Sequence, residues 1–153
     1  MTKTQFDRQP TLENDLLILR PLKEDDFEDL YAVASDPLIW EQHPQKDRCK
    51  REVFEGFFKE AMESGGAFAV IDQKTNQMIG STRFKPVKES DNAIEIGWTF
   101  LARTYWGGNY NRSMKNLLIN YAFNLVEHVL FYVHGNNTRS RKAVEKIGGV
   151  LIT

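Results

Sequence analysis

Two short polar segments follow apolar runs and have the residue types needed to hold an anionic ligand. In the first, Tyr-Trp-Gly-Gly-Asn-Tyr-Asn-Arg at residues 105–112, two glycines permit a sharp turn and the asparagines tolerate left-handed or capping conformations. Backbone N–H groups at the start of the helix that should follow have no partner within it, and they attract phosphate. The alternative is an ordinary glycine-rich turn in which Asn111 caps the helix.

The second polar segment, residues 136–140, follows the apolar run 129–134. Asn137 and Ser140 stand one helical turn apart, so both side chains can point to a ligand beside the end of the preceding strand. The alternative is that Asn137 or Thr138 only caps the short helix that comes next. If the two preceding strands are neighbours, both polar segments face one cleft, which favours the ligand-binding interpretation.

A third candidate group is the carboxylate of Glu95. Alternation over residues 93–100 predicts a strand with Glu95 on one face and the apolar side chains on the other, namely Ile94, Ile96, Trp98 and Phe100. On a central strand, partial burial would raise the pKa of Glu95, which suits a general base near neutrality. The alternative is a structural ion pair with a cation on a neighbouring strand, such as Arg83.

The elements that must position these groups follow from hydrophobic periodicity. Alternating or uniformly apolar runs predict strands over residues 16–22, 67–72, 78–85, 93–100 and 129–134. Apolar residues at helical spacing predict helices over residues 24–34, 51–63, 112–127 and 139–147. This order predicts an α/β domain whose mixed sheet is antiparallel early, parallel around the long helix, and flanked by helices.

Composition limits the function classes. A chain of 153 residues is large enough for one domain with a core, and its formal net charge of −1 argues against a nucleic-acid partner. The single cysteine, Cys49, excludes an internal disulfide and suits a reducing compartment. No apolar run is long enough to cross a bilayer, and the N-terminus lacks the apolar core of a secretion signal.

From these properties we expect a cytoplasmic protein with no membrane partner. Residues 1–14 are polar and predicted to be a flexible lead-in, and residues 15–153 are predicted to form one domain. The three histidines lack the spacing of metal ligands, so we expect no metal site.

Several motifs resemble those of the GNAT acyltransferase superfamily, particularly the branch that is similar to the N-terminal acetyltransferases of ribosomal proteins. The most specific are Asn-Thr-Arg-Ser at residues 137–140 and Val-Glu-Lys-Ile-Gly at residues 144–148. Glu-Ile-Gly-Trp at residues 95–98 and Tyr-Trp-Gly at residues 105–107 also fit that branch. The resemblance covers nearly the whole chain from Leu16 onward.

The resemblance implies acetyl-CoA as the donor, bound in a cleft between the splayed strands 93–100 and 129–134. It implies a diphosphate loop at residues 106–111, and a pantetheine arm beside Phe100 and Leu101. The cofactor-binding residues it implies, with the two basic neighbours of the loop, are Phe100, Leu101, Arg103, Trp106, Gly107, Gly108, Asn109, Tyr110, Asn111, Arg112, Asn137 and Ser140. Glu95 as the base and Ser140 beside the thioester sulfur are the expected catalytic residues. We expect Trp40, His43 and Trp98 to contact the acceptor.

The function implied is acetyl transfer to a primary amine, either a peptide N-terminus or a small molecule, by direct attack in a ternary complex. The alternative is a degenerate module that binds CoA or a protein without catalysis. Asn109 and Asn111 stand where the family usually has small residues, and Val144 stands where many relatives have a tyrosine. The chain ends before the family's final hairpin, so the open sheet edge is expected to permit a homodimer.

Overall fold

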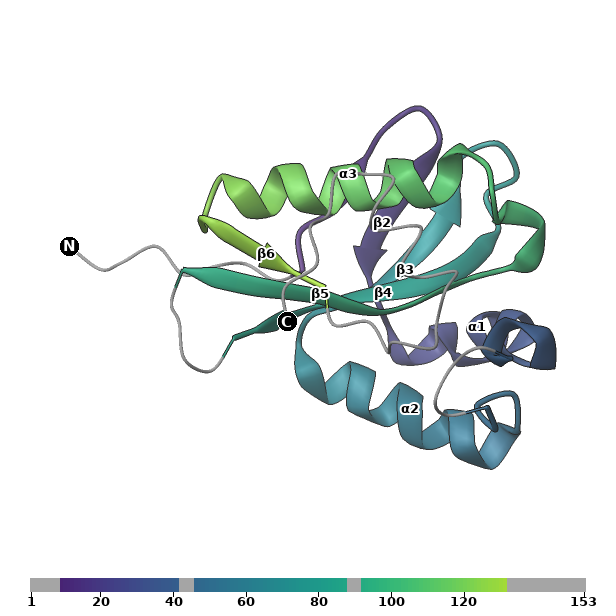
Figure 1. Cartoon of the computed structure of the whole chain (residues 1–153). Coiled ribbons are helices and arrows are strands. Elements are labelled where there is room, and N and C mark those ends of the chain that lie inside the picture. Colours follow the sequence, from purple (N-terminus) through teal and green to yellow (C-terminus); the bar gives the residue numbers. More distant parts are fainter. Residues whose placement is uncertain (1–8, 42–45, 88–91, 132–153) are drawn as a thin grey trace.

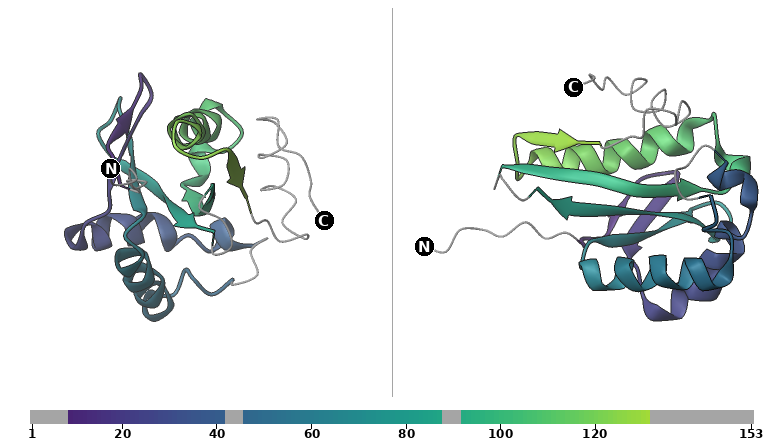
Figure 2. Two further views of the ribbon diagram at one scale, coloured as in Figure 1. Left: turned by 90° about the vertical axis from the view of Figure 1, so that its left-hand side faces the viewer. Right: turned by 60° about the horizontal axis from the view of Figure 1, so that its bottom comes forward.

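The computed structural model describes residues 9–41, 46–87 and 92–131. Its sheet has six strands in sequence order, and helices cover both faces (Figures 1 and 2). The strands are β1 (Leu12–Glu13), β2 (Leu17–Pro21), β3 (Ala67–Asp72), β4 (Met78–Pro86), β5 (Ala93–Leu101) and β6 (His128–Leu130). The helices are α1 (Phe27–Ala34), α2 (Arg51–Ser64) and α3 (Asn109–Phe123), with short 3-10 helices η1 (Glu24–Asp26), η2 (Pro37–Trp40) and η3 (Arg103–Tyr105).

The strand directions confirm the predicted mixed sheet. Neighbouring strands from β1 to β5 are antiparallel, whereas β5 and β6 are parallel. A parallel pair needs a crossover connection, and α3 provides it. The predicted helix 139–147 and the end of the predicted strand 129–134 lie outside the described residues.

The sheet separates two apolar clusters because its side chains alternate between the faces. On the α3 face, Phe68, Val70, Phe84, Ile94 and Ile96 pack with Met114, Leu118 and Ala122 of the helix. On the α1 and α2 face, Ala67, Ala69 and Ile71 pack with Leu30, Phe54, Phe57, Phe58 and Ala61. Figure 2 shows α3 on one side of the sheet and α1 and α2 on the other.

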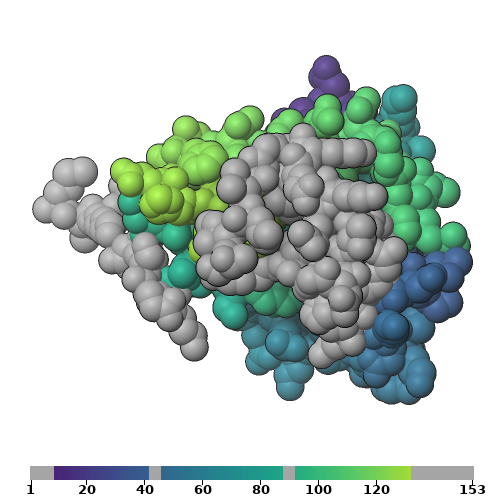
Figure 3. Space-filling model, viewed as in Figure 1, coloured from purple at the N-terminus to yellow at the C-terminus, as the bar shows by residue number. Residues whose placement is uncertain are grey.

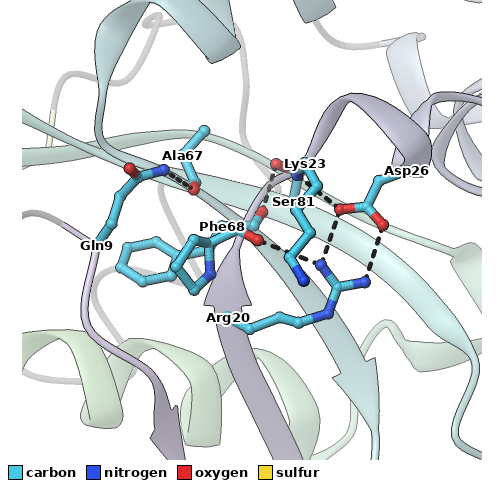
Figure 4. A network of polar contacts seen from close by, with 8 residues as sticks. Gln9, Arg20, Lys23, Asp26, Ala67, Phe68 and Ser81 are labelled. Carbon is cyan, nitrogen blue, oxygen red and sulfur yellow. Dashed lines mark hydrogen bonds and ion pairs between the residues drawn. The ribbon is translucent and has the colours of Figure 1, made fainter.

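A half-buried ion pair fixes the way in which the chain leaves β2 and enters the first helices. Arg20 donates two hydrogen bonds to the carboxylate of Asp26, at 2.8 and 2.9 Å, and the backbone N–H of Lys23 donates to the same carboxylate at 2.8 Å (Figure 4). In the same view, the Ser81 hydroxyl donates to the carbonyl of Phe68 at 2.7 Å, which joins β4 to β3. Asp26 thereby closes the turn between β2 and η1.

Two short elements were not predicted from the sequence. Leu12 and Glu13, which lie in the segment expected to be a flexible lead-in, pair with β2 as strand β1. The segment after α1, expected to be a loop, contains η2, with Asp36 accepting from the N–H of Leu38 as its cap. Both short elements lack the length at which hydrophobic periodicity is readable.

The long helix α3 begins three residues before the predicted position and ends four residues earlier. Its N-cap is Gly108, and therefore not Asn111, which lies within the first turn. The polar Asn-Tyr-Asn start carries no apolar period, so the pattern could not show it. At the other end, the N–H groups of Leu125 and Val126 both bond to the carbonyl of Ala122, which turns the chain towards β6.

The predicted alternation of β5 is wrong beyond Gly97. Arg83 of β4 pairs with Gly97 and Ser81 pairs with Phe100, so β5 holds one extra residue between these pairs. Trp98 absorbs the insertion with a φ of 51°, in the left-handed region. As a result Trp98 and Phe100 join the α1 and α2 face, whereas Ile94 and Ile96 stay on the α3 face.

The bulge brings β4 and β5 close together at Gly80. A Cβ atom on Gly80 would lie 2.0 Å from the carbonyl oxygen of Phe100 and 3.0 Å from the Cα of Leu101. Both are backbone atoms, so neither can move away as a flexible side chain would. The position therefore requires glycine.

We expect Gly80→Ala to lower the free energy of unfolding by at least about 2 kcal/mol, because the strands must separate to admit the methyl group. For a chain of this size the melting temperature should fall by roughly 4–8 °C. Gly56→Ala in α2 is the matched control. No atom lies within 4 Å of a Cβ at Gly56, so the higher helix propensity of alanine should stabilise the protein by up to about 1 kcal/mol. Equal melting temperatures for the two variants would contradict the close approach.

Candidate functional site

Strands β5 and β6 pair over a short stretch. Among the described residues the pairs run from Ala93 with His128 to Glu95 with Leu130, whereas β5 continues to Leu101. No described strand pairs with this side of β5 beyond Glu95. The splayed strand pair stays a prediction, because the end of the predicted strand 129–134 lies outside the described residues.

The start of α3 offers unsatisfied backbone donors near the end of β5. Gly107 has a φ of 75°, and Gly108, the N-cap, is extended with φ −102° and ψ −154°. No side chain caps the helix, and Gly107, Gly108 and Asn109 are exposed. Nothing lies within 4 Å of the Cβ positions at either glycine, so the first turn of α3 faces open space. This geometry suits a phosphate group.

Side chains around the predicted diphosphate loop hold it against the sheet. The Tyr105 hydroxyl donates to Asp72 Oδ2 at 2.6 Å, and the Tyr110 hydroxyl donates to Asp72 Oδ1 at 3.3 Å. The two tyrosine rings pack edge to face with centroids 4.7 Å apart. The Trp106 indole N–H donates to the carbonyl of Leu101 at 2.9 Å. The predicted pantetheine contact at Leu101 would therefore have to use its N–H group.

The predicted diphosphate neighbour Arg103 lies at the surface and forms an ion pair with Asp36, which precedes η2. This contact holds η3 beside η2, and Figure 3 shows the green surface of the η3 region meeting the blue surface of that segment. Arg112 is exposed on the first turn of α3. The charge of Arg103 is therefore balanced by Asp36, and Arg112 is the exposed cation beside the first turn of α3.

Lys115 is a functional candidate that the sequence pattern did not reveal. It is 6% exposed in the first half of α3, and its ammonium group donates to Asn111 Oδ1 at 3.1 Å. Its Nζ lies 5.7 Å from the ring centroid of Phe131, just after β6. Burial lowers the pKa of Lys115 to about 8. The contact also draws the Asn111 side chain towards Lys115.

The lowered pKa of Lys115 predicts a pH dependence of stability. The unfolded chain holds this proton up to its ordinary pKa of 10.5, whereas the folded chain releases it near pH 8, so stability should rise with pH between these values. In Lys115→Met this rise should be absent. The free energy of unfolding of the variant at pH 7 should also be higher, by at most about 3 kcal/mol. Denaturant melts of both proteins at pH 7, 8, 9 and 10 test the prediction, and parallel curves would refute it.

Glu95, the expected base, is half-buried on β5, opposite Lys85 of β4. Burial raises the pKa of Glu95, and the nearby positive charges of Lys85 and Arg83 act in the opposite direction. Neither cation forms an ion pair with Glu95 within 4 Å in the described part of the chain. The carboxylate therefore has the burial expected of a base and lacks the ion pair of the alternative interpretation.

The structure separates the residues expected to contact the acceptor. Trp98 is half-buried on the Glu95 face because of the bulge. Trp40 is 2% exposed, donates to the carbonyl of Ala34 at 2.9 Å and packs on Phe100, so it belongs to the core. His43 lies outside the described residues, as do Asn137 and Ser140.

Arg83 is the second buried cation that the sequence pattern did not single out as a ligand. It is 5% exposed on β4, next to Trp98. The sequence indicated Arg83 only as a possible ion-pair partner of Glu95. The alternation of the strand predicts on which face Arg83 lies but cannot show that α2 covers it.

In the described residues no group of three or more histidine, cysteine or acidic side chains could hold a metal ion. No helix among them has the length and apolar content to span a bilayer.

A model of the acetyltransferase (GNAT) domain matches residues 17–150. The chain belongs to the GNAT acetyltransferase family. Members of this family use acetyl-CoA as the acetyl donor, which agrees with the donor inferred from the sequence motifs. A comparison with curated protein sequences gives no significant match.

Solved structures share the GNAT fold of this chain. A GCN5-related N-acetyltransferase from Brucella melitensis is 22% identical with a TM-score of 0.77, over 92% of this chain and 67% of that one. The microcin C7 self-immunity acetyltransferase MccE, solved with acetyl-CoA and AMP, is 14% identical with a TM-score of 0.74, over 88% and 79%. A Vibrio cholerae protein assigned as a ribosomal-protein-serine acetyltransferase is 15% identical with a TM-score of 0.68, over 94% and 84%. At these identities the matches show the fold.

Proposed function

We propose that this GNAT protein is an N-acetyltransferase that moves the acetyl group of acetyl-CoA to a primary amine by direct attack in a ternary complex. The observation that carries the proposal is the position of Glu95. It is half-buried, free of a close ion pair to Arg83 or Lys85, and located where the β5–β6 ladder ends. The acceptor is a peptide N-terminus or a small-molecule amine.

In the proposed reaction, Glu95 removes a proton from the ammonium form of the acceptor, directly or through water. The amine nitrogen then bonds to the thioester carbonyl carbon, and the carbon–sulfur bond breaks so that the sulfur leaves as thiolate. The nitrogen gives its second proton to this sulfur, which yields the amide and the CoA thiol, and Glu95 returns its own proton to solvent. A raised pKa makes Glu95 a stronger proton acceptor near neutral pH. Ser140, from the sequence motif, is proposed to donate a hydrogen bond to the leaving sulfur.

The start of α3 is proposed to hold the diphosphate of the donor. The helix dipole and the backbone N–H groups of its first turn favour a negative charge, and Arg112 adds to this potential. Asn111 does not conflict with this role, because its side-chain oxygen is turned to Lys115. Asn109 is exposed and leaves the first turn open. Asn109 and Asn111 are thus compatible with a bound diphosphate, which both the enzyme and a CoA-binding module require.

We expect Glu95→Gln to lower kcat by about 100-fold or more, because the amide keeps the shape of the side chain and cannot accept the proton. In the unaltered protein the rate should fall on the acidic side as Glu95 becomes protonated, and this limb should be lost in the variant. The pH–rate profiles of both proteins test the assignment. A variant with nearly normal turnover and the same acidic limb would make Glu95 structural.

We expect Asn109→Pro to weaken CoA binding without unfolding the protein. Asn109 is the first residue of α3, where proline fits, and the preceding Gly108 is extended, as a residue before proline prefers. The change removes one N–H donor, and a hydrogen bond to a charged group contributes about 1.5–3 kcal/mol. The dissociation constant for CoA should therefore rise by roughly 10- to 100-fold in calorimetry. Asn109→Ala keeps the donor and is the matched control, so equal affinities of the two variants would reject the loop assignment.

A screen of primary amines with acetyl-CoA tests the function as a whole. Mass spectrometry should detect an acetylated acceptor, and release of the CoA thiol should saturate with that acceptor. A protein that binds CoA but acetylates no amine would favour the binding module.

A further inference from the structure

Arg83 is a buried cation whose guanidinium group has two nitrogen atoms without a hydrogen-bond partner in the described residues. The side chain is 5% exposed, and its Nε and Nη2 atoms are buried without a partner within the described part of the protein. A buried charge with unsatisfied donors is unfavourable, and such groups in folded proteins are usually paired. Burial lowers the pKa of Arg83 to about 10, so the group still carries its charge at neutral pH. The Arg83 guanidinium therefore has no anionic partner among the described residues, and a bound anion would supply one.

Aromatic rings hold this guanidinium in place. Its Cζ atom lies 4.5 Å from the ring centroid of Trp98 and 5.6 Å from that of Phe57. Each of these rings also has a second cation nearby: Arg48 is 4.8 Å from the Phe57 centroid, and Lys85 is 5.3 Å from the Trp98 centroid. An aromatic ring attracts a guanidinium by its face, which leaves the N–H donors in the guanidinium plane available for another group.

The acids near Arg83 do not supply the missing partner. Glu60 and Glu95 are close enough to favour its charged form, but neither forms an ion pair with it within 4 Å. These two carboxylates also disfavour a doubly charged anion such as a phosphate group beside them. A guanidinium presents a planar pair of donors, which matches a single planar carboxylate.

The site lies beside the proposed base. Arg83 pairs with Gly97 and Lys85 pairs with Glu95, so Arg83 and Glu95 stand on the same sheet face, two positions apart on adjacent strands. Diagonal neighbours of this kind have Cα atoms separated by about 7–8 Å. This spacing suits one small molecule that places an amine at Glu95 and an anionic group at Arg83.

We propose that the acceptor is a primary amine that also bears a carboxylate, and that Arg83 binds this carboxylate. The proposal rests on the proposed acetyltransferase function and specifies its substrate class. Two sources share this chemistry: a free amino acid and a peptide N-terminus with an acidic side chain nearby. Arg83 acts as a specificity-determining residue, and Trp98 and Phe57 hold its guanidinium.

The test compares acceptors that differ only in the carboxylate. Glycine is compared with glycinamide, and a peptide amide with aspartate at its second position is compared with the same peptide carrying asparagine. We expect kcat/KM to be at least 10-fold higher for the carboxylate member of one pair, and that pair identifies the source. In Arg83→Gln this ratio should fall to about 1, mainly through KM. Lys74→Gln, an exposed change in the β3–β4 turn, removes the same charge and should leave the ratio unchanged.

A second measurement separates this inference from the acetyltransferase function. Calorimetry without an acetyl donor should detect binding of N-acetylglycinate but not of N-acetylglycinamide, with at least 10-fold weaker binding in Arg83→Gln. If Arg83→Gln does not fold, Arg83→Lys keeps the charge without the paired donors and should lower both ratios. Arg83-dependent carboxylate binding without any turnover would support the anion site and reject the enzyme.

Other outcomes would reject the proposed anion site at Arg83 without contradicting the proposed acetyltransferase function. They are turnover of amines without a carboxylate preference, equal losses for both members of a pair in Arg83→Gln, and a preference for phosphoethanolamine over the carboxylates.

Discussion

The extra residue in β5 is the constraint on which the arrangement of the site depends. A regular strand would place Trp98 and Phe100 on the α3 face with Ile94 and Ile96. The insertion at Trp98 reverses that alternation, so both aromatic side chains pack towards α2. The hydroxyl groups of Thr82 and Thr99 hydrogen bond across the bulge at 2.9 Å, and bulges increase the local twist. A stronger twist beyond Glu95 fits the end of the β5–β6 ladder there.

The two layers of helices have different roles around this strand. The α3 face provides the backbone donors of its first turn, and Asp72 anchors that turn to the end of β3 through Tyr105 and Tyr110. The α2 face provides rings and cations, since both Arg48 and Arg83 lie close to the ring of Phe57. The start of α3 is thus proposed to bind the diphosphate of the donor, whereas the α2 face is proposed to bind the acceptor. Both regions border the second half of β5.

The sequence predicts the elements well and the site in part. The longer strands and helices were found because burial imposes a period of 2.0 or 3.6 on apolar residues. A bulge adds one residue without changing composition, so alternation misassigned Trp98 and Phe100. The first turn of α3 was missed because its exposed asparagines have no period. Arg83 lies against Phe57 of the distant helix α2, and Lys115 lies against Phe131 after β6, and no local pattern contains these contacts.

The bulge also explains how a base and an arginine can stand close together without neutralising each other. The direct cross-strand partner of Arg83 is Gly97, which has no side chain, and the inserted Trp98 offers its ring to the guanidinium instead. A close ion pair would stabilise the Glu95 carboxylate and lower its pKa, which would weaken it as a base. Stacking on Trp98 therefore preserves the basicity of Glu95 and leaves the donors of Arg83 available, so one inserted residue serves both proposed roles.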